Sequence, residues 1–429
     1  MIDPELRRAC AIVVKQDTRP LRRALFARLA ARTPALRVAL AAWERLGAGR
    51  RAAAFVSPLA LQCFLEVRPP RRDADLLGVW KYENERRQLA ALSALDPAIP
   101  IEMITLEPTA AATVLDEPRS AGALARVPEA WDLLREYATR GDFLVAARVA
   151  CTIGYYLRML PLLRHSRAAA VLVSSDSNPY AMALVHAARR LGRRTCFVTH
   201  GHVAAGPPPL DFDLSLLDGP VVREVYERAG AIRAAVVFKG SEGRVRPMDT
   251  SRLRGGVRTL GVVLSILVDW PRVGALLDRL RADLSPERIV LRLHPNRTML
   301  DPQWARHVSL AGVRVSRGER PLTEDAEACD LVVAGNTSAH LTVLKLGVPT
   351  AYLPALDDVG ADYYDFVNER IVAPIADDGS IDVGAIARFY DDPGWAPRFA
   401  RFDAGYPDRQ EACDRAVLEG LRALLERRA

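Results

Sequence analysis

A strand that turns into a helix is encoded by Leu331-Val332-Val333-Ala334-Gly335-Asn336-Thr337-Ser338-Ala339-His340. Its first four residues predict a buried strand, the next four are small and polar, and Leu341 to Leu346 predict a helix that Gly347 ends. Small hydroxyl and amide side chains cap the free N–H groups of a helix start, and those N–H groups, with the helix dipole, attract anions. The pattern predicts an α/β domain that binds a phosphate here. A helix cap without a ligand is the alternative.

A second predicted strand end lies about forty residues earlier, where Ile289 to Leu293 precede His294-Pro295. An imidazole there can hydrogen-bond a phosphate oxygen, and its protonated form would stabilise a leaving nucleotide. Arg292 alternates with leucines, so it is either a phosphate ligand or the solvated face of an edge strand. Together the two strand ends predict a nucleotide donor site built from Arg292, His294, Asn336, Thr337 and Ser338.

Strands and helices alternate on both sides of this region, which predicts parallel, doubly wound sheets. The Gly-, Arg-, Ser- and Pro-rich segment 239–256 is the expected linker. We therefore expect an N-terminal, acceptor-side domain over residues 1–245 and a donor domain over residues 246–405. A C-terminal helix in residues 406–429 is expected to pack back on the first domain. Ligands should gather at the carboxyl ends of the strands, in a cleft between two Rossmann-like domains.

The first 165 residues are more helical, with strands predicted at Ala52 to Ser57 and Ile99 to Leu106 and helices at Leu76 to Leu95 and Pro128 to Leu163. At 429 residues the chain suits two domains, and its net charge of +7 is modest for that length. Six dispersed cysteines indicate a reducing compartment without disulfides. We expect a cytoplasmic protein, with surface association at the inner face of the cell membrane as the one membrane contact.

Several function classes are disfavoured by missing motifs. The chain has no GxxxxGK[ST] sequence, no GxGxxG after a strand and no GxSxG elbow. No basic patch is interleaved with aromatic residues, so a nucleic-acid partner is not expected. No histidine or carboxylate stands at a telling distance from His200 and His202, so no metal site and no cofactor are predicted.

The predicted first domain also ends its strands in polar residues. His200-Gly201-His202 follows one strand, and His200 would face the donor as a general base, with a satisfied buried histidine as the alternative. Asp218 is a second candidate base or a turn aspartate. Asp176 either contacts the acceptor, orients His200 or caps a helix. His202 and, in the second domain, Asp362 and Tyr363 are the remaining predicted acceptor or sugar contacts.

These motifs resemble those of bacterial GT-B glycosyltransferases of capsule and surface-polysaccharide synthesis. The likeness covers roughly residues 165–370. It is greatest to enzymes that use cytidine-activated donors, namely sialyl-, polysialyl- and Kdo transferases and CDP-glycerol glycerophosphotransferases. The resemblance implies that His294, Thr337 and Ser338 bind the donor phosphate and that His200, in the His-Gly motif, is the base. Asp218-Gly219 is similar to a catalytic Asp-Gly pair of some sialyltransferases. The carboxylate that many relatives carry in the helix after the serine motif is missing here.

We therefore expect a metal-independent transferase of GT-B architecture. It would move a sugar, or a glycerol-phosphate-like unit, from a CMP- or CDP-linked donor to a glycan or lipid-linked acceptor. A nucleotide-sugar epimerase of the same architecture is one alternative. A non-catalytic nucleotide- or glycan-binding protein is the other.

Overall fold

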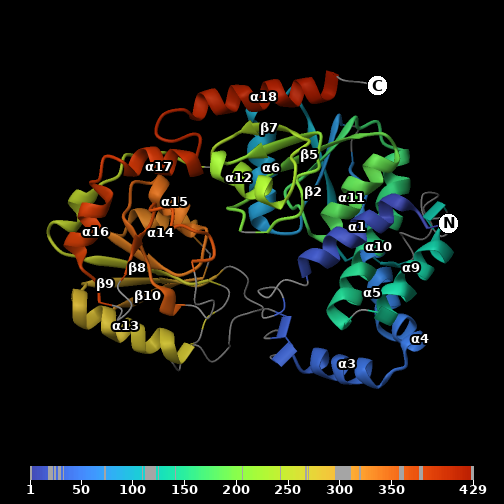
Figure 1. Ribbon diagram of the computed structural model, residues 1–429, viewed down its shortest axis with the longest axis horizontal. Helices are drawn as coiled ribbons and strands as arrows, with labels where there is room; N and C mark the ends of the chain where they lie inside the picture. Colours follow the sequence, from blue (N-terminus) through green and yellow to red (C-terminus); the bar gives the residue numbers. More distant parts are fainter. Residues whose placement is uncertain are drawn as a thin grey trace.

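Two α/β units, each built on its own sheet, make up the computed structural model (Figure 1). It describes residues 2–426 except 18–22, 24–25, 28–29, 32, 72–73, 109, 112–121, 124, 141, 205, 242, 266–267, 269, 295–310, 318–319, 357–361 and 376–379. Pro295 and a helix predicted at residues 302–307 lie outside the described residues. The predicted fold class, two α/β domains with parallel sheets, is confirmed.

The first sheet has seven strands in the order β1-β3-β2-β4-β5-β6-β7. β1 is antiparallel to β3, and the other neighbours are parallel. The strands are β1 (Val67–Arg68), β2 (Leu76–Val79), β3 (Ile101–Leu106), β4 (Ala170–Val173), β5 (Arg194–Val198), β6 (Leu214–Leu217) and β7 (Ala235–Phe238).

The second sheet has six strands, all parallel, in the order β10-β9-β8-β11-β12-β13. β9 is paired on both sides, so it is not an edge strand. The strands are β8 (Thr259–Val263), β9 (Arg288–Arg292), β10 (Val313–Ser316), β11 (Leu331–Ala334), β12 (Thr350–Tyr352) and β13 (Ala373–Pro374).

Helices cover both sheets. Those before the second sheet are α1 (Pro4–Asp17), α3 (Pro34–Arg45), α4 (Ala48–Arg51), the π-helix η1 (Ala52–Val56), α5 (Ser57–Glu66), α6 (Glu83–Leu95), α9 (Val127–Arg140), α10 (Phe143–Arg164), α11 (Pro179–Arg190), α12 (Pro220–Ala229) and the 3-10 turn η2 (Thr250–Leu253). The later ones are α13 (Trp270–Leu284), α14 (Leu322–Glu327), α15 (Ala339–Lys345), η5 (Pro354–Leu356), α16 (Val383–Tyr390), α17 (Trp395–Phe402) and α18 (Gln410–Glu426).

The helix α10 is the one described helix whose length and apolar composition match a membrane span. It is, however, mostly buried inside the protein, where it packs between α5 and α11. The contact with α5 is so close that a Cβ on Gly154 would lie 2.1 Å from the carbonyl oxygen of Ala60. These contacts are those of the central helix of a folded domain.

After the second sheet the chain returns to the first one through α18, which lies across β6 and β7 (Figure 1). Val417, Leu421 and Leu424 of α18 share one apolar core with Leu214 and Leu216 of β6. The second sheet is therefore inserted between β7 and α18. The domain limits at residues 245 and 405 stay a prediction.

Two predicted elements near the N-terminus are wrong. Residues 52–57 form η1 and the start of α5 rather than a strand, and residues 76–79 form β2 rather than the start of a helix. All four residues of β2 are buried, and a Cβ on Gly78 would lie 2.8 Å from Met103 Sδ on β3. A strand that is covered on both faces is a continuous apolar run, which periodicity cannot distinguish from a buried helix.

Candidate functional site

The carboxyl ends of β5 and β11 meet where the two domains adjoin. Gly201 follows β5 and Ser338 follows β11, and a Cβ on Gly201 would lie 3.6 Å from Ser338 Oγ. The polar loops that the sequence singled out in the two halves of the chain are therefore neighbours, with space for little more than one methyl group between Gly201 and Ser338 Oγ. We call this meeting point the domain junction.

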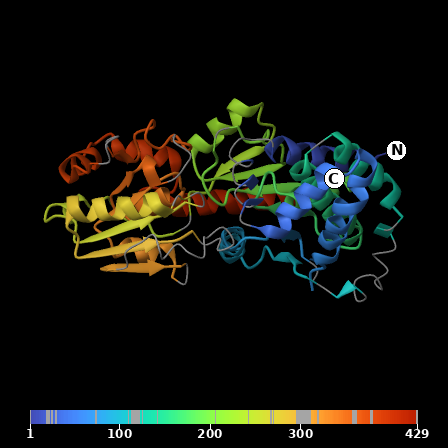
Figure 2. The same cartoon turned by 90° about the horizontal axis from the view of Figure 1, so that it is seen from below.

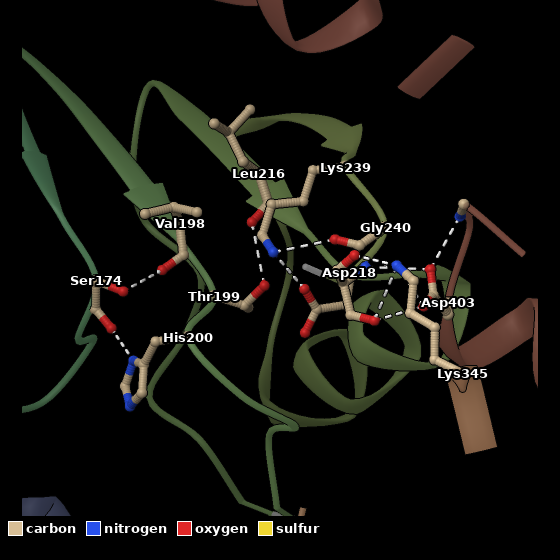
Figure 3. A network of polar contacts seen from close by, with 12 residues as sticks. Ser174, Val198, Thr199, His200, Leu216, Asp218, Lys239, Gly240, Lys345 and Asp403 are labelled. Atoms are coloured by element: carbon tan, nitrogen blue, oxygen red, sulfur yellow. Dashed lines mark hydrogen bonds and ion pairs between the residues drawn. The ribbon is translucent and has the colours of Figure 1, made fainter. Parts of the chain in front are cut away.

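His200 is held at the junction by the backbone of the neighbouring strand end. Its Nδ1 is hydrogen-bonded to the carbonyl oxygen of Ser174, and Ser174 Oγ donates to the carbonyl of Val198 at 3.1 Å (Figure 3). A carbonyl only accepts hydrogen bonds, so Nδ1 must carry the proton. Nε2, which points away from Ser174 (Figure 3), is then the basic nitrogen of the neutral ring. This is the tautomer that a general base requires.

His202 has a different environment, because it is buried among aromatic rings of the second domain. Its ring centroid lies 5.7 Å from that of Tyr364 and 5.2 Å from those of Phe366 and Phe402. Burial lowers its pKa to about 3. Its Nδ1 has no hydrogen-bond partner among the described residues. This enclosure favours a packing role over the predicted contact with an acceptor.

Asp176 is hydrogen-bonded to α12, whereas Nδ1 of His200 is bonded to Ser174. The Oδ2 atom of Asp176 accepts a hydrogen bond of 2.8 Å from the hydroxyl of Tyr226 on α12. Ser175, rather than Asp176, stabilises the approach to α11, since its Oγ accepts from the backbone N–H of Asn178 at 3.1 Å. Asp176 is half-buried beside the junction, and a contact with the acceptor stays a prediction.

Asp218, the second candidate base, is buried in an ion pair. Its Oδ1 lies 2.5 Å from Lys239 Nζ, and Lys239 also donates to the carbonyl of Gly240 at 3.0 Å (Figure 3). Burial raises the pKa of this carboxyl, although Lys239 opposes the shift. The carboxylate of Asp218 is already paired with the ammonium group of Lys239, and the Asp218 side chain is 5% exposed. The geometry favours a structural role for Asp218, and the choice of His200 as base stays a prediction.

A second buried pair, which sequence reasoning missed, lies in the second domain beside the first pair and is linked to the first domain through Ser241. Lys345 of α15 lies 3.2 Å from Asp403, which follows α17. Asp403 also accepts hydrogen bonds from the N–H and hydroxyl of Ser241, and Lys345 donates to the Ser241 carbonyl. Gln410 donates to the Lys239 carbonyl at 2.9 Å. A lysine at the end of an apolar helix was the signal that could have revealed this network.

The donor-side turn is shaped by its own side chains. Thr337 Oγ1 accepts from the Ala339 N–H at 3.2 Å, whereas Ser338 makes no capping bond although it is the N-cap residue of α15. Asn336 donates to the Tyr352 hydroxyl at 2.9 Å and accepts from the Tyr363 N–H at 2.6 Å. Asn336 therefore has a structural task, and Ser338 is the residue of this turn that faces the other domain.

The side chain of His340 connects the same turn to β12 by hydrogen bonds. It is buried, with Nε2 3.0 Å from the Gly335 carbonyl and Nδ1 2.8 Å from Thr350 Oγ1. Nε2 therefore donates and Nδ1 accepts, and burial lowers the pKa of this histidine to about 4. Sequence reasoning gave His340 no role. Here it is the residue that locks the polar turn onto β12.

His294 follows β9 and is partly buried, and burial lowers its pKa to about 4. The ring is therefore neutral near pH 7 and carries one N–H group. A phosphate dianion placed beside it would raise that pKa, because a nearby negative charge favours the imidazolium. His294 follows a strand of the same parallel sheet as β11, and its contact with phosphate stays a prediction.

The side chain of Arg292, which the sequence predicted as a phosphate ligand, is bound to a buried carboxylate. Its Nη1 lies 2.6 Å from Asp325 Oδ2 and donates to Ser316 Oγ at 3.2 Å. Asp325 is 3% exposed, and Arg314 pairs with its other oxygen at 2.7 Å. The geometry favours a structural ion pair over phosphate binding, because the guanidinium compensates a buried carboxylate.

The carboxylate of Asp362 is also hydrogen-bonded within the protein, to backbone N–H groups. Its two oxygens accept from the N–H groups of Phe366 at 3.0 Å, Val367 at 2.6 Å and Asn368 at 3.2 Å. These bonds favour a turn-forming role over contact with sugar hydroxyls. Tyr363 packs edge-on against Tyr364, with ring centroids 5.1 Å apart, and lies beside Asn336. Of the two, Tyr363 is the one placed close to the donor-side turn.

No group of three or more His, Cys, Asp and Glu side chains within the described ranges is placed to hold a metal ion. A cavity of about 1330 Å³ lies away from the junction, at the amino ends of β4, β5, β6 and β7. Arg189, Arg194 and Arg233 line it, and the first two pair with Asp211 and Asp213. None of the site residues that the sequence predicted is among the residues that line this cavity.

Neither the protein-family models nor the curated proteins contain a match to the chain. Several solved structures, in contrast, are similar to the chain. A putative UDP-N-acetylglucosamine 2-epimerase from Listeria monocytogenes aligns over 83% of this chain and 98% of its own, at 12% identity and a TM-score of 0.50. The UDP-GlcNAc 2-epimerase from Neisseria meningitidis bound to UDP-GlcNAc aligns over 81% and 99%, at 11% identity and a TM-score of 0.47.

The glycotransferase of kitacinnamycin aligns over 82% of this chain and 100% of its own, at 16% identity and a TM-score of 0.47. At such identities a likeness bears on the fold alone, which for this chain is the two-domain α/β fold of the GT-B type.

Proposed function

We propose that this protein is a nucleotide-sugar enzyme whose reaction takes place at the domain junction, with His200 as general base and Ser338 and His294 on the donor phosphate. The observation that supports it best is the pairing of two loops. The Ser174 carbonyl holds His200 with Nε2 as its basic nitrogen, and the adjoining Gly201 faces Ser338 of the second domain. The proposed base and the proposed phosphate-binding turn thus lie on neighbouring loops, which supports the proposal.

Transfer is the activity that we favour. In the proposed reaction His200 Nε2 takes the proton of an acceptor hydroxyl, and that oxygen attacks the anomeric carbon of the donor sugar. The bond from that carbon to the nucleotide phosphate breaks, and the phosphate leaves with the electron pair. His294 and Ser338 donate hydrogen bonds to the leaving oxygens, which stabilises the charge as it develops. We place the reaction in the cytoplasm and assign no metal ion to it.

The donor that we propose is a CMP- or CDP-linked sugar, or a CDP-linked polyol, for which the acceptor oxygen would attack the phosphorus next to the polyol and CMP would leave with the electron pair. Support for cytidine comes from the likeness of His294-Pro295 and Thr337-Ser338 to the motifs of transferases that use such donors. The acceptor is proposed to be a surface or capsular glycan, or its lipid-linked precursor. A Cβ at position 201 would already touch Ser338 Oγ, so we infer that the domains part to admit the donor and close again around it.

Epimerisation is the second candidate, and the same close contact favours it. With the His200 loop against the donor-side turn, a base in that loop would lie near the donor sugar itself. An epimerase would isomerise the sugar of its donor without any acceptor. Incubation of the protein with CMP-, CDP- and UDP-linked sugars alone, followed by chromatography of the sugar, separates this activity from transfer.

Nucleotide binding tests the donor site. We expect calorimetry to show a cytidine nucleotide binding more tightly than UDP or GDP, and His294→Ala to weaken that binding. A preference for UDP or GDP would keep the enzyme class and discard the cytidine donor. If neither CMP, CDP, UDP nor GDP binds, the proposed function is wrong.

His200→Ala tests the base. We expect kcat to fall by about a hundredfold or more, since general base catalysis typically contributes that much, while the Kd of the nucleotide stays within about twofold. His165→Ala is the matched control, because His165 Nδ1 also bonds a backbone carbonyl, that of Pro161 at 2.7 Å, but at the end of α10. Equal activity of the two variants would remove His200 from the mechanism.

A further inference from the structure

The positive charge of this protein is concentrated at its N-terminus. Residues 1–51 contain twelve Lys and Arg against four Asp and Glu, a net charge of +8. The whole chain carries +7, so the other 378 residues are close to neutral, at −1. Charge clustered in this way creates a local field that an even distribution would not.

The helix α3 presents part of that charge to solvent. Its exposed side carries Arg37, Val38 and Arg45, whereas Trp43 on the opposite side is buried. Arg50 of α4 is exposed just beyond. The guanidinium groups of these three arginines have no ion-pair partner among the described residues, and Glu44 is the one acidic residue of α3.

Exposed apolar side chains gather at the same end of the molecule. Four of the five large hydrophobic residues that stand exposed within the described ranges are on α3, α5 and α9, which lie together at one end in both views (Figures 1 and 2). They are Val38 at 69% exposure, Leu61 at 54%, Val127 at 42% and Trp131 at 37%. Arginines without ion-pair partners among the described residues and exposed apolar side chains thus occur on helices at the same end of the molecule (Figure 1), which matches a surface that carries both negative charge and hydrocarbon.

We propose that this end of the molecule, the α3 face defined by Arg37, Val38, Arg45 and Arg50, binds the surface of a bilayer that contains anionic lipids. Arginines attract the phosphate-rich surface, and Val38 and Trp131 contact the boundary between headgroups and acyl chains. A nucleic acid would satisfy the arginines and leave the apolar residues in water, which is why a lipid surface is the better match. The proposal does not depend on the activity assigned to the domain junction.

Sedimentation of the full chain with sucrose-loaded vesicles tests the proposal. We expect binding to vesicles of phosphatidylcholine with 30% phosphatidylglycerol, little binding to phosphatidylcholine alone, and release as NaCl rises from about 0.05 to 0.5 M because salt screens the charges. Each basic residue near an anionic surface is worth about fivefold in partition. The triple variant Arg37→Glu/Arg45→Glu/Arg50→Glu should therefore partition at least about a hundredfold less.

Two control variants distinguish a charge effect from damage to the fold. Arg37→Lys/Arg45→Lys/Arg50→Lys keeps the charge and should bind vesicles nearly as the wild type does. Arg254→Glu/Arg258→Glu/Arg288→Glu removes three exposed arginines of the second domain and should also leave binding unchanged. Equal loss in this control, or wild-type binding that is the same with and without phosphatidylglycerol, would overturn the proposal. So would displacement of the protein from vesicles by RNA at an equal phosphate concentration.

Discussion

Replacement of Lys345 by Met tests the buried charge network that joins the two domains. The substitution keeps an unbranched side chain of similar length but removes the cation that faces Asp403 at 3.2 Å. The two side chains are 1% and 2% exposed, so solvent cannot compensate the carboxylate that is left behind.

The size of the effect follows from what remains around Asp403. Removing one partner of a buried ion pair typically costs 3–5 kcal/mol. Asp403 would still accept bonds from the backbone N–H groups of Ser241 and Gly405, at 3.1 and 3.0 Å, so we expect the lower end of that range, about 3 kcal/mol. For domains of this size such a loss lowers Tm by about 6–12 °C.

Thermal and urea unfolding of the wild type, Lys345→Met, Asp403→Asn and the double variant measure this cost. We expect the double variant to be more stable than the sum of the single losses by about 1 kcal/mol or more, because the uncompensated charge is then gone. Lys15→Met on the exposed side of α1 is the control, with an expected change below about 1 kcal/mol. If Lys345→Met costs no more than this control, the network does not stabilise the fold as argued.

Two further substitutions have defined outcomes. His202→Phe should match the aromatic surroundings and remove the acid sensitivity of this site. Since the pKa of His202 is lowered from 6.5 to about 3, the unfolded chain binds a proton that the folded one does not, and stability falls as pH drops below 6.5. Between pH 7 and pH 5 the wild type should lose about 2 kcal/mol of unfolding free energy through this histidine, and the variant should not. Urea titrations at the two pH values measure this loss, and an equal loss in both proteins would contradict the prediction. Gly347→Ala should cost about 1–3 kcal/mol more than Gly192→Ala in the same assay. Both glycines have φ near +70°, but only at Gly347 would the new Cβ meet an atom, the Pro247 carbonyl oxygen at 2.1 Å. Equal losses would show that the Pro247 segment moves freely.

The second domain was predictable because its strands are short apolar runs that end in conspicuous polar residues. β11 and the turn after it are where the strand-to-helix pattern of residues 331–340 placed them, and α15 spans seven residues instead of the predicted six. The N-terminal region was harder, since β2 is buried on both faces and its sequence lacks the alternation that identifies a half-exposed strand.

Whether the sequence could predict the role of a candidate site residue depended on where the partner of that residue lies. The sequence could single out His200 and Ser338 as candidates from their places at strand ends, but it could not reveal that Arg292 pairs with Asp325, thirty-three residues later, or that Asp218 pairs with Lys239. A polar residue at a strand end is equally suited to a ligand and to a buried ion pair. Only the fold decides between them, because the partner lies on another element.

The return of the chain to the first sheet limits how the two domains can be separated or exchanged. Because α18 supplies Val417 and Leu421 to the core of the first domain, that domain is discontinuous in sequence. The second domain is therefore exchangeable with that of another protein only as an internal cassette with two junctions. A chimaera made with a single crossover would give the first domain a foreign final helix, whose apolar side chains would have to fit the strands β6 and β7.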